Sequence, residues 1–326
     1  MISSDEPSIA AVGVTKRYGK TVALRDVSFS ASASTVTALL GPNGAGKTTM
    51  VRILSTLTRP DNGTARVCGY DVVKDPERVR GVIGLTGQAL SVDGKLSGQQ
   101  NLAMFARLHR LAWPVVRERS ARLLELFDLG SAANRPVKTY SGGMRRKLDL
   151  ALSLIAEPTI LFLDEPTTGL DPASRQALWD VIRGLVRRGT TVLLTTQYLE
   201  EADALADSVV FINAGQLVAA GPPAQLKARA GQAQFDLVAS SPADLIRLTG
   251  ALGAHAAATD DANRSVRVTV RGGGLDGIRE LNAITAAAAQ AGVSIERFTL
   301  HEPDLSDVYF QLTGHAPAAG VPVDAA

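Results

Sequence analysis

Short apolar runs alternate with stretches of helical spacing through the first two thirds of the chain. The runs are rich in Val, Ile, Leu and Thr, a composition typical of strands buried on both faces. They occupy positions 35–40, 159–163, 191–195 and 208–212. Strands of this kind separated by helices predict an α/β domain with a largely parallel sheet.

A different pattern fills the segment between the first and second of these runs. Over 98–129 the apolar residues recur at helical rather than strand spacing. They are Leu102, Phe105, Leu108, Leu123, Leu124, Leu126 and Phe127. We therefore expect a helical insertion, from about residue 89 to residue 150, inside a first domain that spans 8–225.

The pattern changes again after Gly221-Pro222-Pro223, where Gly and Pro together mark a domain boundary. The following segment reads as strand, helix, two strands, helix and strand, with a short helix at 304–312. This βαββαβ order predicts a small α+β domain of ferredoxin-like topology over 231–314. Residues 315–326 are small and include Pro, which predicts a flexible tail.

Length and composition fit an ordinary globular protein. The 326 residues suggest about two domains, and 45% of them are hydrophobic and 20% charged. The longest nearly uncharged apolar stretch, 151–163, is too short to cross a bilayer, and the acidic first residues do not resemble a secretory signal. We therefore expect a cytoplasmic protein. The single cysteine, Cys68, is expected to be structural.

The charge balance argues against nucleic acid as a partner. The 34 basic and 32 acidic residues give a net charge of +2, too little to neutralise a run of phosphates. The densest basic run is Arg145-Arg146-Lys147. A run this short, close to a helix start, predicts a solvated helix face.

The strongest chemical signal lies between an apolar strand at 36–40 and a helix at 49–57. Here the pattern G-x-x-x-x-G-K-[ST] occurs in full. Its residues, with the threonine that follows, are Gly41, Pro42, Asn43, Gly44, Ala45, Gly46, Lys47, Thr48 and Thr49. The loop predicts a nucleotide phosphate site: backbone amides bind phosphate oxygens, Lys47 reaches the β and γ phosphates, and the Thr48 hydroxyl ligates Mg²⁺.

A second metal ligand is expected at the end of the apolar run 160–163. Asp164 and Glu165 follow it directly. Asp164 is predicted to hold Mg²⁺, and Glu165 to orient or deprotonate a water in line with the γ-phosphate. Taken alone, carboxylates at a strand end commonly do no more than solvate it. Other phosphate-loop enzymes share both elements, so a third motif must separate the classes.

That third motif is Tyr140-Ser141-Gly142-Gly143-Met144. It resembles the L-S-G-G-Q signature of ABC (ATP-binding cassette) ATPases. Ser141, Gly142 and Gly143 open a helix, where backbone amides form a second anion site. The resemblance implies a head-to-tail dimer in which each ATP lies between the phosphate loop of one copy and the Ser-Gly-Gly of the other. By itself the motif is also compatible with an N-capped helix that binds nothing.

The resemblance covers about residues 11–221, with every motif in order. Tyr18 lies where the family has an aromatic that stacks on adenine, although an aromatic near a hairpin more often packs. Gln88 matches a family glutamine that ligates Mg²⁺ or places the attacking water, at the start of the helical segment that contacts a membrane partner. Asp171 matches a residue that faces the opposite subunit. The implied fold is an α/β P-loop NTPase domain of ABC type with a helical insertion.

Two positions depart from the family pattern. Met144 replaces the signature glutamine, with little expected effect because Ser141 and backbone amides bind the phosphate. Gln197 stands where most cassettes have a histidine at the γ-phosphate. A glutamine amide can donate that hydrogen bond but cannot carry charge or move a proton, so catalysis is expected to be slower or differently controlled.

The segments 54–57, 195–203 and 303–313 resemble the ATP-binding subunits of daunorubicin-resistance exporters. This resemblance implies a peripheral subunit on the cytoplasmic face of the membrane. Its ATP-driven dimer closure would export a drug, polyketide or lipid through a separate multispanning permease. The cargo itself is not encoded here, because its contacts belong to the permease.

Other functions share part of this pattern. A soluble cassette acting in translation or DNA maintenance usually has two cassettes, a long coiled coil or a basic surface. An ATP-dependent switch without turnover is favoured by Gln197, while the presence of Glu165 argues against it. A small-molecule kinase would not require Ser141-Gly142-Gly143.

Overall fold

The chain forms two compact units in this computed structural model, which describes residues 7–87, 90–253, 256–270 and 274–313. The division falls between Pro223 and Ala224, beside the Gly-Pro-Pro sequence. The tail predicted for 315–326 lies outside the described residues. Within the described ranges, no helix combines the length and the apolar character needed to cross a membrane.

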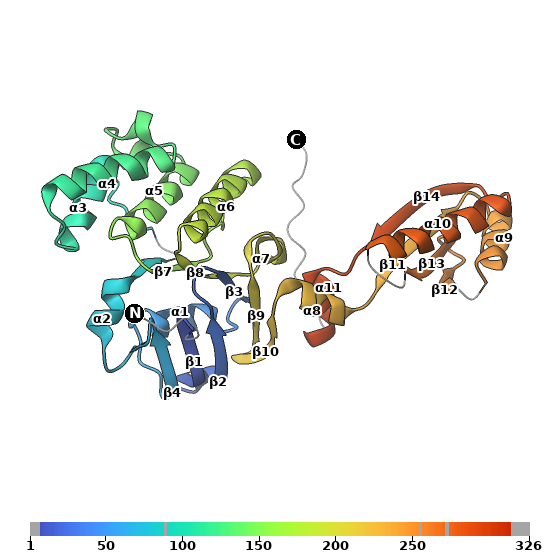
Figure 1. Cartoon of the computed structure of the whole chain (residues 1–326), viewed down its shortest axis with the longest axis horizontal. Helices are drawn as coiled ribbons and strands as arrows, with labels where there is room; N and C mark the ends of the chain where they lie inside the picture. Colours follow the sequence, from blue (N-terminus) through green and yellow to red (C-terminus); the bar gives the residue numbers. More distant parts are fainter. Residues whose placement is uncertain (1–6, 88–89, 254–255, 271–273, 314–326) are drawn as a thin grey trace. The chain divides into compact units, whose positions relative to one another are not determined.

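The central element of the first unit is a six-stranded sheet of order β10-β9-β3-β8-β7-β6, in which only the β9–β10 pair is antiparallel (Figure 1). Its strands are β3 (Val36–Leu40), β6 (Ile83–Thr86), β7 (Ile160–Asp164), β8 (Thr191–Thr196), β9 (Ser208–Asn213) and β10 (Gln216–Gly221). Every residue of β3, β7 and β8 is buried. Burial on both faces explains their continuous apolar sequence, and the α/β prediction is confirmed.

A second, four-stranded antiparallel sheet has the order β2-β1-β4-β5. Its strands are β1 (Ile9–Tyr18), β2 (Thr21–Ala31), β4 (Asn62–Val67) and β5 (Tyr70–Asp71). Exposed positions interrupt the buried ones along β2 and β4, so these strands lack the apolar runs that reveal the six-stranded sheet. This sheet was not predicted from the sequence.

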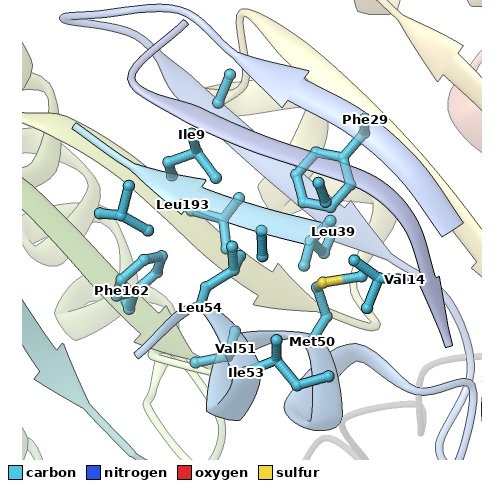
Figure 2. Close-up of a cluster of buried hydrophobic side chains, with 14 of the residues drawn as sticks. Ile9, Val14, Phe29, Leu39, Met50, Val51, Ile53, Leu54, Phe162 and Leu193 are labelled. Carbon is cyan, nitrogen blue, oxygen red and sulfur yellow. The ribbon is translucent and has the colours of Figure 1, made fainter. Parts of the chain in front are cut away.

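The main core joins the two sheets through α1 (Lys47–Leu54), as Figure 2 shows. Met50, Val51, Ile53 and Leu54 of this helix share a buried cluster with residues of both sheets. Their spacing gives α1 one apolar side, which fixes the helix that follows the phosphate loop. Cys68 is buried in the same cluster, as expected for a structural cysteine.

Helices account for the rest of the first unit. They are α2 (Pro76–Val82), α3 (Gly98–Leu108), α4 (Trp113–Leu126), α5 (Gly142–Leu154), α6 (Pro172–Arg187) and α7 (Leu199–Leu205), with short 3₁₀ turns at Gly130–Ala132 and Val137–Thr139. The predicted helical insertion is present as α3, α4 and α5, which contact one another (Figure 1). Leu102 and Leu123 are buried there, but Leu108 at the end of α3 is 72% exposed.

The second unit contains the predicted ferredoxin-like fold. After α8 (Pro223–Ala230), its elements are β11 (Ala233–Ala239), α9 (Pro242–Leu252), β12 (Ala256–Asp260), β13 (Ser265–Val270), α10 (Gly274–Gln290), β14 (Ile295–His301) and α11 (Leu305–Thr313). The sheet is antiparallel with the order β12-β13-β11-β14, as this topology requires. α9 and α10 pack on one face of it around a separate apolar core.

The beginning and the end of this unit lie side by side. Gln234 of β11 is paired with His301 of β14. Next to these strands, the side-chain amide of Gln311 on α11 donates a hydrogen bond to the carbonyl of Ala230 on α8. The chain therefore enters and leaves the sheet at one place.

Candidate active site

The phosphate loop lies between the central strand β3 and α1. Its first glycine, Gly41, runs so close to β9 that a Cβ there would be 2.0 Å from the Ile212 carbonyl oxygen. Gly46 has φ 107°, and a Cβ there would be 2.5 Å from the Ala23 carbonyl oxygen. Both positions require glycine for reasons of space, and at Gly46 the backbone conformation requires it as well. Neighbouring strands thus fix the loop at both ends.

Lys47 is the buried cation of this loop, with 4% of its side chain exposed. Its Nζ donates hydrogen bonds to the carbonyls of Gly41, at 2.7 Å, and Pro42, at 3.1 Å. Glu165 Oε1 lies 3.6 Å from the same nitrogen. Burial lowers the pKa of Lys47, and the Glu165 carboxylate opposes that shift. The structure therefore brings together the two residues that the sequence assigned to the phosphate and to the water.

Asp164 ends β7 and is buried, with 4% exposed. Its Oδ1 accepts hydrogen bonds from Thr48 Oγ1, at 3.2 Å, and Thr195 Oγ1, at 2.5 Å. A hydroxyl and a carboxylate this close can share one cation, and both are the hard oxygen ligands that Mg²⁺ prefers. The residues present thus fit a Mg²⁺ ion. Gln88, the third predicted ligand, lies outside the described residues.

Glu165 takes an unusual backbone conformation, with φ 50°. Its backbone N–H donates to Thr195, with 3.1 Å to the carbonyl and 3.0 Å to Oγ1. The turn follows directly on the last residue of β7, and only 13% of the Glu165 side chain is exposed. Left-handed backbone is uncommon for a residue with a Cβ, and such residues cluster at functional sites.

Gln197 leaves the sheet beside the start of the phosphate loop, because Leu40 is paired with Thr196. The residue is half-buried, and the N–H of the next one, Tyr198, donates to Thr196 Oγ1 at 2.9 Å. The carboxyl edge of the parallel strands therefore brings Gln197 into the neighbourhood of Gly41 and of Asp164, whose strand neighbour is Thr195.

A fully buried carboxylate, Glu201, lies just beyond this segment and was not identified from the sequence. Its Oε1 accepts a hydrogen bond from Trp179 Nε1 at 3.3 Å. Burial raises the pKa of Glu201, and the hydroxyls of Thr196 and Thr167 partly oppose the shift. The sequence feature that could have indicated its burial is its spacing from Ala202 and Leu205, the other buried residues of α7.

The signature residues open α5 at the surface. Ser141 is the N-cap of this helix and accepts a hydrogen bond from the Met144 N–H at 3.2 Å. Asp171 caps α6 in the same way: Oδ1 accepts from the Ser174 N–H at 2.9 Å, and Oδ2 from the Ser174 hydroxyl at 2.6 Å. A Cβ on Gly143 would be 3.1 Å from Ser174 Oγ, so Ser174 brings the two motifs together.

Tyr18 ends β1 and is 48% exposed, so it is not a core residue. The Lys16 ammonium lies 5.5 Å from the centre of its ring and 2.7 Å from Asp61 Oδ1. The ring is thus partly covered by Lys16 and partly exposed, and its exposed part can contact a planar group.

One interpretation of the sequence is wrong. Arg146 was expected on a solvated face, with Arg145 and Lys147, but only 7% of it is exposed. Its guanidinium donates to backbone carbonyls around Asp164 and Glu165. The signal that could have revealed it is helical spacing, since Arg146 lies one turn from the buried Asp149 and Leu150.

Comparisons with known proteins identify the family of this chain. The family model described as "ABC transporter" matches residues 24–168. The chain is 47% identical to the doxorubicin resistance ATP-binding protein DrrA of Mycobacterium tuberculosis (strain CDC 1551 / Oshkosh), over 95% of both chains. It is 46% identical to the daunorubicin resistance ATP-binding protein DrrA3 of Streptomyces coeruleorubidus, over 95% of this chain and 96% of the relative.

A solved structure of an ATP binding subunit of an ABC transporter shares the fold. It is 26% identical, with a TM-score of 0.62, and the match covers 68% of this chain and 92% of the other. The resemblance inferred from the phosphate loop, signature and following motifs is thereby confirmed. The chain belongs to the ABC transporter family, as one of its ATP-binding proteins.

Proposed function

We propose that this chain is the ATP-hydrolysing subunit of an exporter, which binds ATP with Mg²⁺ and acts as a dimer on a separate membrane permease. The observation that carries the proposal is the meeting of Lys47, Asp164 and Glu165 at the mouth of the phosphate loop. A cation, a metal ligand and a carboxylate base are the groups that phosphoryl transfer to water requires.

Nucleotide binding uses residues on three elements. Tyr18 stacks on adenine, and the amides of the loop from Gly41 to Thr49 bind phosphate oxygens with the help of the α1 N-terminus. Lys47 exchanges its carbonyl partners for the β and γ phosphates. Thr48 and Asp164 hold Mg²⁺, together with Gln88. When bound, the ion neutralises charge on the phosphate oxygens.

In the hydrolytic step, Glu165 accepts a proton from a water whose oxygen attacks the γ-phosphorus. The bond from that phosphorus to the bridging oxygen breaks, and ADP and phosphate are released. Gln197 donates a hydrogen bond to the γ-phosphate. It supplies no charge, so it stabilises the transition state less than a protonated histidine would.

A second copy of the chain completes the site. The exposed Ser141 with Gly142 and Gly143 would bind the γ-phosphate held by the partner's loop, and Asp171 would face that partner. The proposal is supported by the exposure of both caps and by their link through Ser174. ATP thus closes the dimer, and hydrolysis opens it.

The proposal includes a permease partner, a place on the cytoplasmic face of the membrane, and a drug, polyketide or lipid cargo. It is supported by the similarity to ATP-binding proteins of doxorubicin and daunorubicin resistance. The similarity extends over 95% of this chain, so it includes the C-terminal unit as well as the nucleotide site.

Two measurements on the full-length chain test the proposal. ATP turnover should require Mg²⁺ and stop with EDTA, and ATP should shift the chain from monomer to dimer in light scattering. Membrane vesicles that contain the chain and its permease should expel labelled doxorubicin only with ATP. Nucleotide binding without turnover under all these conditions would favour an ATP-dependent switch, the alternative that Gln197 raises.

A further inference from the structure

Arg146 contacts the backbone of the active site more extensively than any group predicted from the sequence. Its Nε donates to the Pro166 carbonyl at 2.9 Å. Its Nη2 donates to the carbonyls of Asp164, at 3.2 Å, and Glu165, at 2.9 Å. Its Nη1 donates to the Gly87 carbonyl at 2.9 Å. A single guanidinium therefore joins the ends of β6 and β7.

The charge of Arg146 is compensated within its own helix. Asp149, one turn later on α5, is 2% exposed, and its Oδ2 lies 3.7 Å from Arg146 Nη1. Its Oδ1 accepts a hydrogen bond from the Ser91 N–H at 2.7 Å, while Oδ2 has no hydrogen-bond partner among the residues that the structure describes. Burying such an ion pair costs desolvation free energy that an apolar pair of similar size would not.

Glu165 is consequently held from both sides. Its N–H is bound by Thr195 on β8, and its carbonyl by Arg146 on α5. With both peptide groups fixed and φ in the left-handed region, these two neighbours set the direction of the Cα–Cβ bond, from which the carboxylate reaches towards Lys47. A shift of α5 would move the carbonyl and turn the carboxylate.

We propose that Arg146, supported by Asp149, is a positioning residue for hydrolysis that ties Glu165 to the helix carrying Ser141. The inference rests on the role proposed for Glu165. Because Ser141 begins α5 and Arg146 lies in its second turn, docking of the partner's ATP on Ser141 is transmitted to Glu165 through one rigid helix. The two ATP sites of the dimer are thereby coupled, because each copy contributes Ser141 to one site and Glu165 to the other.

The test compares Arg146→Met and Arg146→Lys with Arg119→Met in the full-length chain. Arg119 is a matched control, since it donates to the Ile155 carbonyl at 3.0 Å and pairs with Glu157, away from Glu165. We expect Arg146→Met to lower kcat about 10- to 100-fold with KM and ATP affinity within about 2-fold of the parent. Arg146→Lys should restore part of kcat, and Arg119→Met should keep all of it.

Three results would overturn the inference. A parental kcat in Arg146→Met is one, and an equal loss in Arg119→Met is another. The third is a parallel fall of kcat and ATP affinity in Arg146→Lys, which indicates general damage. If Arg146→Met does not fold, Arg146→Lys and Asp149→Asn decide: lower kcat at unchanged KM supports the inference, and parental kcat in both overturns it. A parent that hydrolyses no ATP instead overturns the proposed function, and this inference with it.

Discussion

Thr195 donates its hydroxyl to Asp164 Oδ1 across 2.5 Å, joining the ends of two neighbouring parallel strands. The same hydroxyl accepts the N–H of Glu165. Thr195 on β8 therefore orients both Asp164, the last residue of β7, and Glu165, which follows it. Since Thr48 reaches the same Asp164 oxygen, the proposed metal ligands and the proposed base share a single hydrogen-bonded network.

Replacing this threonine should lower both the stability of the chain and its ATP turnover. Thr195→Val keeps the shape and removes the hydroxyl, which leaves Asp164 and the Glu165 N–H each with one partner fewer. We expect about 1–3 kcal/mol lower stability and reduced ATP turnover, measured by chemical denaturation and steady-state assay. Thr191→Val at the other end of β8 is the control. The Thr191 hydroxyl accepts a hydrogen bond from the Ser34 N–H, at the opposite end of the strand from Asp164 and Glu165. Equal turnover in the two variants would contradict the network.

Glu165→Gln should retain ATP binding and lose hydrolysis. The amide preserves size and the reach towards Lys47, but it cannot accept the proton of the attacking water. Turnover should fall on the order of 10²- to 10⁴-fold, and the ATP-bound dimer should accumulate in gel filtration with ATP and Mg²⁺. Turnover at the parental rate would mean that Glu165 is not the base.

Gln197 replaces the histidine that most ABC ATPases have at this position, and substitutions there should change ATP turnover in a graded way. Gln197→Ala removes a hydrogen bond to the γ-phosphate, so transition-state stabilisation should fall by roughly 0.5–3 kcal/mol, with turnover affected more than binding. Gln197→His should preserve or raise activity. The measurements are ATPase rate and nucleotide affinity with the permease present, because an isolated cassette can be idle. Parental rates in Gln197→Ala would show that the side chain only fills space.

The C-terminal unit is predicted to support dimerisation or the contact with the permease. A chain ending at Gly231 should still bind ATP, because the phosphate loop, Asp164 and Glu165 all precede the cut. Self-association or binding to the permease should weaken, as followed by light scattering and co-purification. The far-ultraviolet spectrum and the unfolding transition serve as controls for folding. Loss of ATP binding in a well-folded truncated chain would contradict this division of roles.

Prediction from the sequence succeeded best at positions where steric limits determine the residue type. Gly41 and Gly46 cannot carry a Cβ, and β3, the strand that leads into their loop, is buried throughout, so motif and apolar run adjoin each other. The ferredoxin-like order was also predictable, because its strands and helices alternate with clear turn residues.

Residues whose environment is created by distant segments escaped prediction. Arg146 and Glu201 are charged and were read as surface or not considered, because their burial depends on carbonyls and side chains from other elements. In the sequence, Thr195 is an ordinary strand residue, and its contact with Asp164 arises because β7 is paired with β8. The antiparallel sheet was missed because its exposed positions dilute the apolar signal.

The meeting of the first and last strands of the C-terminal unit has a consequence for protein engineering and for evolution. A segment whose ends are adjacent can be exchanged for another domain with similarly close ends without pulling its flanks apart. Here the flanking helices are α8 and α11, which are joined by the hydrogen bond from the Gln311 side-chain amide to the Ala230 carbonyl. The segment from β11 to β14 can therefore be replaced by another domain, such as a sensor domain.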